Sequence, residues 1–85
     1  MAKVEIYTTA SCPYCLRAKA LLKAKGVDYT EISLEGKPDE RQALVARTKM
    51  RTVPQIFIDD ELIGGFDQLA ALESAGKLDE KLGRS

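Results

Sequence analysis

The chain has 85 residues, enough for one small domain with one hydrophobic core, so we expect a single domain over residues 1–85. Hydrophobic residues make up 45% and charged residues 31%, which excludes a disordered or fibrous chain. Thirteen basic residues balance thirteen acidic ones, and no apolar run reaches the length of a membrane span, so neither nucleic acid nor a membrane is an expected partner.

The first half of the chain alternates between strand and helix patterns. Residues 4–8 alternate apolar and polar side chains and are rich in β-branched and aromatic types, which predicts a first strand. From Pro13 to Lys25 the apolar period becomes helical, and Gly26 marks the stop. A second strand is predicted at 29–33, and a second helix is entered near Pro38. The apolar face of the first helix is predicted to hold Tyr14, Ala18, Leu21 and Leu22.

The second half predicts a hairpin followed by a helix. Residues 54–65 contain two short strands joined at Asp59-Asp60, and a last helix begins at residue 66 and is capped by Gly76. A frayed turn is expected in 77–85. The order βαβαββα predicts an α/β fold with a four-stranded mixed sheet and helices on both faces. The residues expected to be buried between these layers are Val4, Ile6, Ile32, Ile56, Phe57 and Ile58.

The two cysteines, Cys12 and Cys15, are predicted to differ in reactivity. Pro13 suits the first helical position, which makes Cys12 the N-cap, with a side chain that accepts hydrogen bonds from the amides of Tyr14 and Cys15. These amides and the helix dipole favour a thiolate, the form that attacks. Cys15 lies one turn inside on the same face and should be more buried. We therefore predict that Cys12 is the nucleophile and Cys15 the resolving thiol.

Other uses of the cysteine pair are less consistent with the sequence. A structural zinc site needs four nitrogen or sulfur ligands, and the chain has two cysteines and no histidine, so no metal site within one chain is predicted. A cluster shared by two chains stays open, because external thiols would complete four sulfur ligands. A purely structural disulfide between Cys12 and Cys15 would close a very short loop and stabilise the chain little.

The start of the sequence, residues 1–10, shows neither a basic segment followed by an apolar stretch nor the composition of a transit peptide. We therefore expect a cytoplasmic protein. In that compartment structural thiols are kept reduced, so a close cysteine pair is more often catalytic or metal-binding than structural.

Three motifs in order, CPYC at 12–15, TVPQIFID at 52–59 and IGGFD at 63–67, make the chain resemble the dithiol glutaredoxins. The likeness covers nearly the whole sequence, and the bacterial single-domain class is the most similar. It implies the thioredoxin-like fold and a glutathione-dependent thiol–disulfide oxidoreductase that reduces protein–glutathione mixed disulfides and protein disulfides.

The resemblance also implies a glutathione site. In the family the bond equivalent to Val53-Pro54 is cis, and the backbone of Val53 would pair with the cysteinyl part of glutathione. Free amides at the helix start after Gly65 suit the γ-glutamyl carboxylate, and the Asp67 side chain suits the ammonium group. Lys49 and Arg51 would hold the glycyl carboxylate. The predicted glutathione-binding residues are Tyr14, Lys49, Arg51, Thr52, Val53, Pro54, Gly65, Phe66 and Asp67.

Each of these residues also has a plainer interpretation. Pro54 would suit the start of any strand, Gly65 and Asp67 would suit an ordinary capping turn, and single lysines and arginines are usually solvated. Tyr14 either flanks the bound thiol, which the family favours, or packs on the apolar face of its helix. Phe66 is expected to form a hydrophobic wall.

The chain departs from the family pattern at two positions. Many glutaredoxins carry a basic residue shortly before the first cysteine, where this chain has Thr9 in the stretch TTAS. Relatives often have a second acidic residue after the position of Asp67, where this chain has Gln68. We expect the first change to remove one cationic aid to thiolate formation and to glutathione binding, and the second to weaken the contact with the ammonium group of glutathione.

The resemblance implies glutathione as a co-substrate, no metal and no tightly bound cofactor, and an indirect supply of electrons from NADPH through glutathione reductase. The expected form is a monomer that acts on glutathionylated or disulfide-bonded proteins. One alternative is a glutaredoxin-like protein reduced by thioredoxin reductase. Others are a dimeric iron–sulfur carrier, against which the proline of CPYC counts, and a non-enzymatic adaptor, against which the intact CPYC counts.

Overall fold

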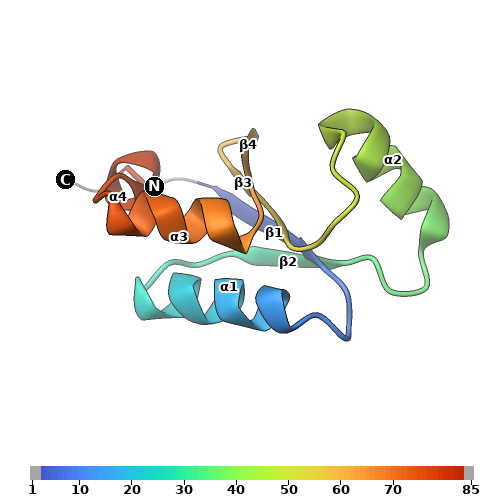
Figure 1. The fold of residues 1–85 in the computed structure, drawn as a ribbon, viewed down its shortest axis with the longest axis horizontal. Helices are drawn as coiled ribbons and strands as arrows, with labels where there is room; N and C mark the ends of the chain where they lie inside the picture. Colours follow the sequence, from blue (N-terminus) through green and yellow to red (C-terminus); the bar gives the residue numbers. More distant parts are fainter. Residues whose placement is uncertain (1–2, 84–85) are drawn as a thin grey trace.

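The computed structural model describes residues 3–83 and has the predicted order of strands and helices, with one short helix added (Figure 1). This extra helix, α4, lies where a frayed turn was expected, and residues 84–85 of that predicted segment are outside the described residues. The elements are β1 (Val4–Thr8), α1 (Pro13–Ala24), β2 (Thr30–Ser33), α2 (Pro38–Thr48), β3 (Gln55–Ile58), β4 (Glu61–Gly64), α3 (Phe66–Ser74) and α4 (Leu78–Lys81).

The four strands form one mixed sheet in the order β2-β1-β3-β4. β1 and β2 are parallel, whereas β3 is antiparallel to both β1 and β4. The hairpin between β3 and β4 turns at Asp59 and Asp60, which both have positive φ, a conformation that aspartate tolerates better than most residues. The predicted four-stranded mixed sheet is therefore confirmed.

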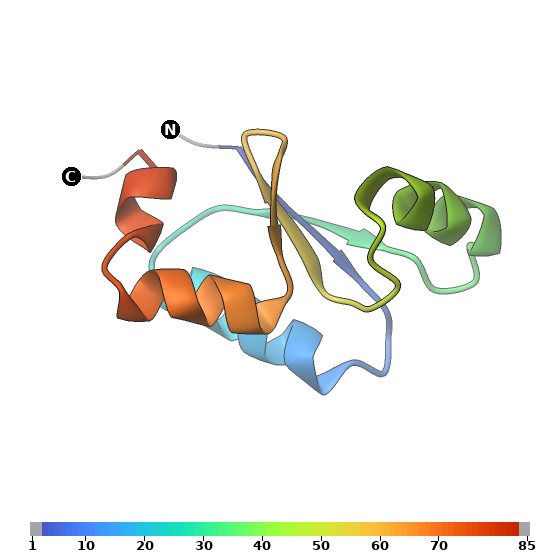
Figure 2. The same ribbon diagram turned by 45° about the horizontal axis from the view of Figure 1, so that its top comes forward.

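One face of the sheet carries the larger core. α1 and α3 lie side by side on this face, and α4 follows α3 (Figures 1 and 2). Alternate residues of β1 and β3 point into the layer between sheet and helices, as a strand period of two requires. The buried residues of this α1/α3 core are Val4, Ile6, Ala18, Leu22, Ile56, Ile58, Leu69, Leu78 and Leu82.

The opposite face carries a smaller core beneath α2. Leu44 is the buried residue of that helix and packs with Leu34 and Phe57, and the Arg47 guanidinium lies 4.5 Å from the centre of the Phe57 ring. Helices thus cover both faces, as predicted. Ile32 corrects one prediction, because it is only half-buried: β2 is an edge strand that α2 covers in part.

The observed boundaries differ slightly from the predicted ones. α1 ends at Ala24 instead of Lys25, β2 starts one residue later than expected, and Pro54 immediately precedes β3 instead of opening it. None of the helices within residues 3–83 is long and apolar enough to cross a membrane.

Candidate active site

The Cys12 sulfur is held at the N-terminus of α1. Cys12 is the N-cap residue with an extended backbone, and Pro13 occupies the first helical position. Its Sγ accepts a hydrogen bond of 3.1 Å from the amide of Cys15, one of the two donors predicted from the sequence. The first turn of α1 contains no acidic side chain that would repel a negative sulfur. The Cys12 sulfur therefore lies at the amide end of α1, next to the Cys15 amide.

Cys15 is the buried member of the pair, with 2% of its surface exposed, whereas Cys12 is half-buried. Burial, followed by a hydrogen bond with Cys12, raises the pKa of the Cys15 thiol to about 12. The backbone of Thr9 and the cation of Lys19 oppose this shift without overcoming it. Cys15 is therefore a protonated thiol at neutral pH, and the predicted burial difference within the pair is confirmed.

A second segment, far away in the sequence, meets the Cys12 sulfur. The Sγ atom lies 3.5 Å from the carbonyl oxygen of Val53, to which the thiol donates. The Val53-Pro54 peptide bond is cis, as the family resemblance implied. Cys12, the predicted nucleophile, therefore lies against the backbone that was predicted to bind the cysteinyl part of glutathione.

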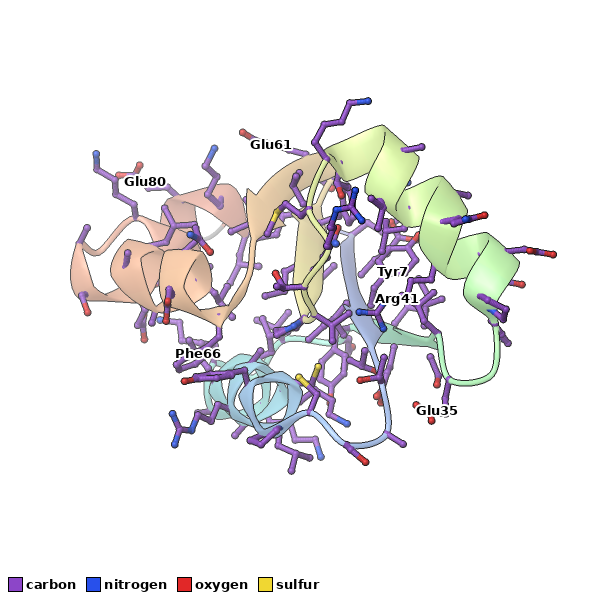
Figure 3. The ribbon with its side chains drawn as sticks, turned by 45° about the vertical axis from the view of Figure 1, so that its right-hand side comes forward. Tyr7, Glu35, Arg41, Glu61, Phe66 and Glu80 are labelled. Atoms are coloured by element: carbon purple, nitrogen blue, oxygen red, sulfur yellow. The ribbon has the colours of Figure 1, made fainter. Side chains whose placement is uncertain are left out.

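Beside Val53 is a hollow of about 400 Å³, a size typical of small-molecule sites. One wall is aromatic: Tyr14 is 53% exposed and its ring centre lies 6.4 Å from that of Phe66. Figure 3 shows Phe66 at the start of α3, above the end of α1 that carries the cysteines. Tyr14 does not pack on the apolar face of α1, so that plainer interpretation is wrong.

The turn before α3 requires glycine at its first position. Gly64 has a φ of +122°, and a Cβ atom there would lie 2.9 Å from Cγ of Gln68. Gly65 follows, and a Cβ atom on it would lie 3.4 Å from the carbonyl oxygen of Pro54. The Gly65 amide donates to Oε1 of Gln68 at 2.9 Å. The backbone at the start of α3 therefore lies close to the carbonyl group of Pro54.

The structure brings most of the predicted glutathione-binding residues to this hollow and leaves two outside its lining. Lys49 ends α2 in a left-handed conformation, and Arg51 is exposed nearby. Two lining residues, Met50 and Gln68, were not predicted. Glutamine three residues after an N-cap is a capping signal, so Gln68 was detectable from the sequence, whereas Met50 carries no such signal. The predicted residues that line the hollow are Tyr14, Thr52, Val53, Pro54, Gly65, Phe66 and Asp67.

The TTAS stretch before Cys12 contacts its surroundings through backbone groups of Thr9 and Ala10. The Ala10 amide donates to a Glu35 carboxylate oxygen at 3.0 Å, and the backbone of Thr9 hydrogen bonds with Cys15.

Across residues 3–83, no group of three or more histidine, cysteine, aspartate or glutamate side chains is placed to hold a metal ion.

A thioredoxin-like sheet with a reduced CPYC pair at a helix N-terminus, facing a cis-proline, defines a thiol–disulfide oxidoreductase. The family model named Glutaredoxin matches residues 4–63, and the chain belongs to the glutaredoxin family. Members of this family are glutathione-dependent thiol–disulfide oxidoreductases, and this chain is an enzyme of that class.

Known relatives agree over nearly the full length. The chain is 52% identical over 82 residues to glutaredoxin 3 of Escherichia coli strain K12, covering 96% of this chain and 99% of that protein. It is 56% identical over 82 residues to a glutaredoxin of Pseudomonas aeruginosa, covering 96% and 98%.

Solved structures show the same fold. A crystal structure of a buckwheat glutaredoxin–glutathione complex matches with a TM-score of 0.90 and 31% identity, covering 96% of this chain and 77% of that one. The solution structure of a glutaredoxin from Brucella melitensis matches with a TM-score of 0.85 and 47% identity, covering 100% and 95%.

Proposed function

We propose that Cys12 and Cys15 divide the work of reducing protein–glutathione mixed disulfides and protein disulfides. The observation that supports this most strongly is the contrast between the two sulfurs. Cys12 is partly exposed at a helix N-terminus, while Cys15 is buried and protonated one turn deeper.

In the first step the Cys12 thiol, which donates to the Val53 carbonyl in the resting structure, releases its proton to solvent, and the resulting thiolate attacks the glutathione sulfur of a mixed disulfide. The bond between glutathione and the protein breaks, the protein leaves as a thiolate that takes up a proton, and Cys12 becomes disulfide-bonded to glutathione. The thiolate of a second glutathione then attacks the glutathione sulfur of this adduct, releasing oxidised glutathione and the Cys12 thiolate. Alternatively, Cys15 loses its proton and attacks Cys12 Sγ, which releases reduced glutathione and closes the intramolecular disulfide.

The hollow beside Val53 is the proposed glutathione site. The complex formed by the buckwheat relative supports a glutathione site in this chain. Here the Val53 backbone would pair with the cysteinyl residue, and the free amides at the start of α3 would hold the γ-glutamyl carboxylate. Asp67 is exposed beside them and would accept from the ammonium group. Lys49 and Arg51, outside the lining, would reach the glycyl carboxylate at the rim.

We further propose that the enzyme works in the cytoplasm as a monomer. No residue of a second chain is needed in this site, since α1, residues 49–54 and the start of α3 supply all of the proposed contacts. Glutathione reductase and NADPH would keep the glutathione pool reduced.

Replacing each cysteine by serine tests the division of roles. Cys12→Ser should reduce a glutathionylated peptide only at the uncatalysed rate, because the attacking sulfur is gone. Cys15→Ser should still reduce that peptide but lose the reduction of protein disulfides that requires both thiols. Both rates are measured with glutathione, glutathione reductase and NADPH. Equal loss of peptide reduction in the two variants would contradict the assignment.

Two further arms of the experiment separate the alternatives. Activity supported by thioredoxin reductase, and not by glutathione with its reductase, would indicate the other electron source. Anaerobic reconstitution with iron and sulfide, followed by a visible spectrum and a mass measurement, would detect a cluster shared by two chains.

A further inference from the structure

The segment between α2 and β3, residues 50–53, is held by its carbonyl groups. The carbonyl oxygens of Met50 and Thr52 both accept from Nε2 of Gln55, at 2.9 Å and 3.0 Å. The Arg51 carbonyl accepts from Nη2 of Arg41 at 3.0 Å, and the Val53 carbonyl accepts from the Cys12 thiol. Four successive carbonyl groups therefore have donors, although the segment belongs to no helix or strand.

The amides of the same peptide groups are left free. Within residues 3–83, no acceptor is recorded for the amides of Arg51, Thr52 and Val53. In a trans peptide the C=O and N–H bonds point in opposite directions. When Gln55 holds the Thr52 carbonyl, it also directs the Val53 amide away from Gln55. Val53 lines the hollow, so the orientation of this amide decides whether a ligand there can use it.

Packing alone does not explain a glutamine at position 55. The side chain is 1% exposed, on the sheet face that also carries Phe57, and its Oε1 atom is buried without a hydrogen-bond donor among the described residues. Burying an acceptor without a donor costs free energy, and an apolar residue of similar size would avoid that cost. What this side chain does in the structure is hydrogen bonding: its Nε2 donates to two carbonyl groups of residues 50–53.

We propose that Gln55 is a positioning residue for glutathione, which clamps residues 50–53 so that the Val53 amide is presented to the cysteinyl part of the ligand. The proposal rests on the proposed glutathione site. Arg41 supports the same segment from α2, and Figure 3 shows its side chain extending from that helix toward the middle of the molecule. Gln55 contacts no reacting atom, so its effect is on ligand binding and not on the sulfur chemistry.

Gln55→Met tests the clamp, because it keeps the length of the side chain and removes the amide. Gln42→Met is the matched control, since Gln42 is exposed on α2. Losing two hydrogen bonds should raise the KM for a glutathionylated peptide about tenfold while kcat stays within about twofold. Heteronuclear NOE values of the Thr52 and Val53 amides in the ligand-free protein should fall, whereas Gln42→Met should change neither readout.

Unchanged KM and unchanged amide order in Gln55→Met would overturn the proposal, as would a lowered melting temperature with no other change. If the wild-type protein proved inactive with glutathione but Gln55→Met still loosened the Val53 amide, the clamp would stand and the glutathione site would fail. If Gln55→Met does not fold, Arg41→Gln serves as the second variant, with a rise in KM of about threefold for the one hydrogen bond lost. No rise in that variant would overturn the proposal.

Discussion

On the face covered by α1 and α3, the sheet is held by a continuous apolar core that includes Leu22 and Leu69, both fully buried. On the α2 face the apolar core is small, and polar contacts add to it: Arg41 and Thr48 of α2 hydrogen bond with the segment before β3, as Gln55 does from the sheet. The candidate active site combines the N-terminus of α1 and the start of α3 from the first face with the segment before β3 that these polar contacts hold.

This difference separates two requirements of the enzyme. The sulfur chemistry needs a fixed distance between a surface thiol and a buried one, and α1 supplies this distance from the well-packed face. The proposed glutathione site needs backbone groups with a defined orientation, and on the sparsely packed face polar contacts hold the carbonyl groups of residues 50–52. In this small domain, dense packing thus positions the two cysteines, and directed hydrogen bonds orient the backbone before β3.

Truncating one leucine on each face of the sheet should cause the largest loss in the free energy of unfolding. Leu22→Ala is expected to lower the free energy of unfolding by about 3–4 kcal/mol, and Leu44→Ala by about 2 kcal/mol, because the site of Leu44 is less enclosed and can relax. Urea denaturation of the reduced proteins measures both values. The control Leu16→Ala, at a residue 64% exposed, should stay within about 0.5 kcal/mol of wild type. Equal losses of unfolding free energy on the two faces would contradict the difference in packing between them.

A smaller effect on the free energy of unfolding is expected in alkaline solution, from the Cys15 thiol. The pKa of Cys15 is raised to about 12 in the fold, first by burial, from an ordinary value of about 9 in the unfolded chain. The unfolded chain therefore releases this proton first, so the stability that the thiol contributes is complete below about pH 9 and is lost as the pH rises toward 12. The slope is at most about 1.4 kcal/mol per pH unit.

The comparison of reduced wild type with Cys15→Ala isolates this contribution. The difference in unfolding free energy between the two proteins should shrink from about pH 8 to about pH 10. A difference independent of pH would show that the Cys15 thiol is less enclosed than its burial in the structure indicates.

The smallest effect concerns a polar contact on the well-packed side. Glu31 accepts from the Thr8 hydroxyl at 2.7 Å and pairs with Lys19 at 3.0 Å, and these contacts, in that order, lower the pKa of the carboxyl group. Its contribution is present above about pH 4.5 and is lost as the pH falls through the lowered pKa.

Glu31→Gln should therefore cost about 0.5 kcal/mol near neutral pH, because the carboxylate is partly exposed to solvent. The cost should vanish in acid, as acid titration of the unfolding free energy would measure. A loss as large as that of Leu22→Ala would show that the α1 face depends on this ion pair more than on its apolar core.

The fold was predictable because its elements follow simple periods. Alternation in β1 and the apolar face of α1 are strong local signals, and Gly26 and Gly76 stop their helices as expected. The four-residue α4 is too short to show a helical period. Ile32 was assigned to the core because the sequence does not show that its strand lies at an edge of the sheet.

The candidate site was predictable where it depends on residue type. It was less predictable where it depends on the direction in which a long side chain extends. Cys12 and Cys15 stand out in the sequence, and the family resemblance implied the cis bond before Pro54. In the structure Cys12 contacts both Cys15 and the Val53 carbonyl that precedes this bond. Lys49 and Arg51 were selected because they precede Thr52, but proximity along the chain does not fix the direction of a long side chain. Gln55 looked like an ordinary strand residue, since its donation to two preceding carbonyls depends on how the chain bends before β3.

The burial of Cys15 directly behind Cys12 has a consequence for oxidative damage. When a peroxide converts the outer sulfur to a sulfenic acid, the inner thiol can attack it, expel water and close a disulfide. That disulfide is reversible, whereas further oxidation to a sulfinic acid is, for most proteins, permanent. The position of the inner cysteine thus allows an oxidised Cys12 to return to the thiol through a disulfide.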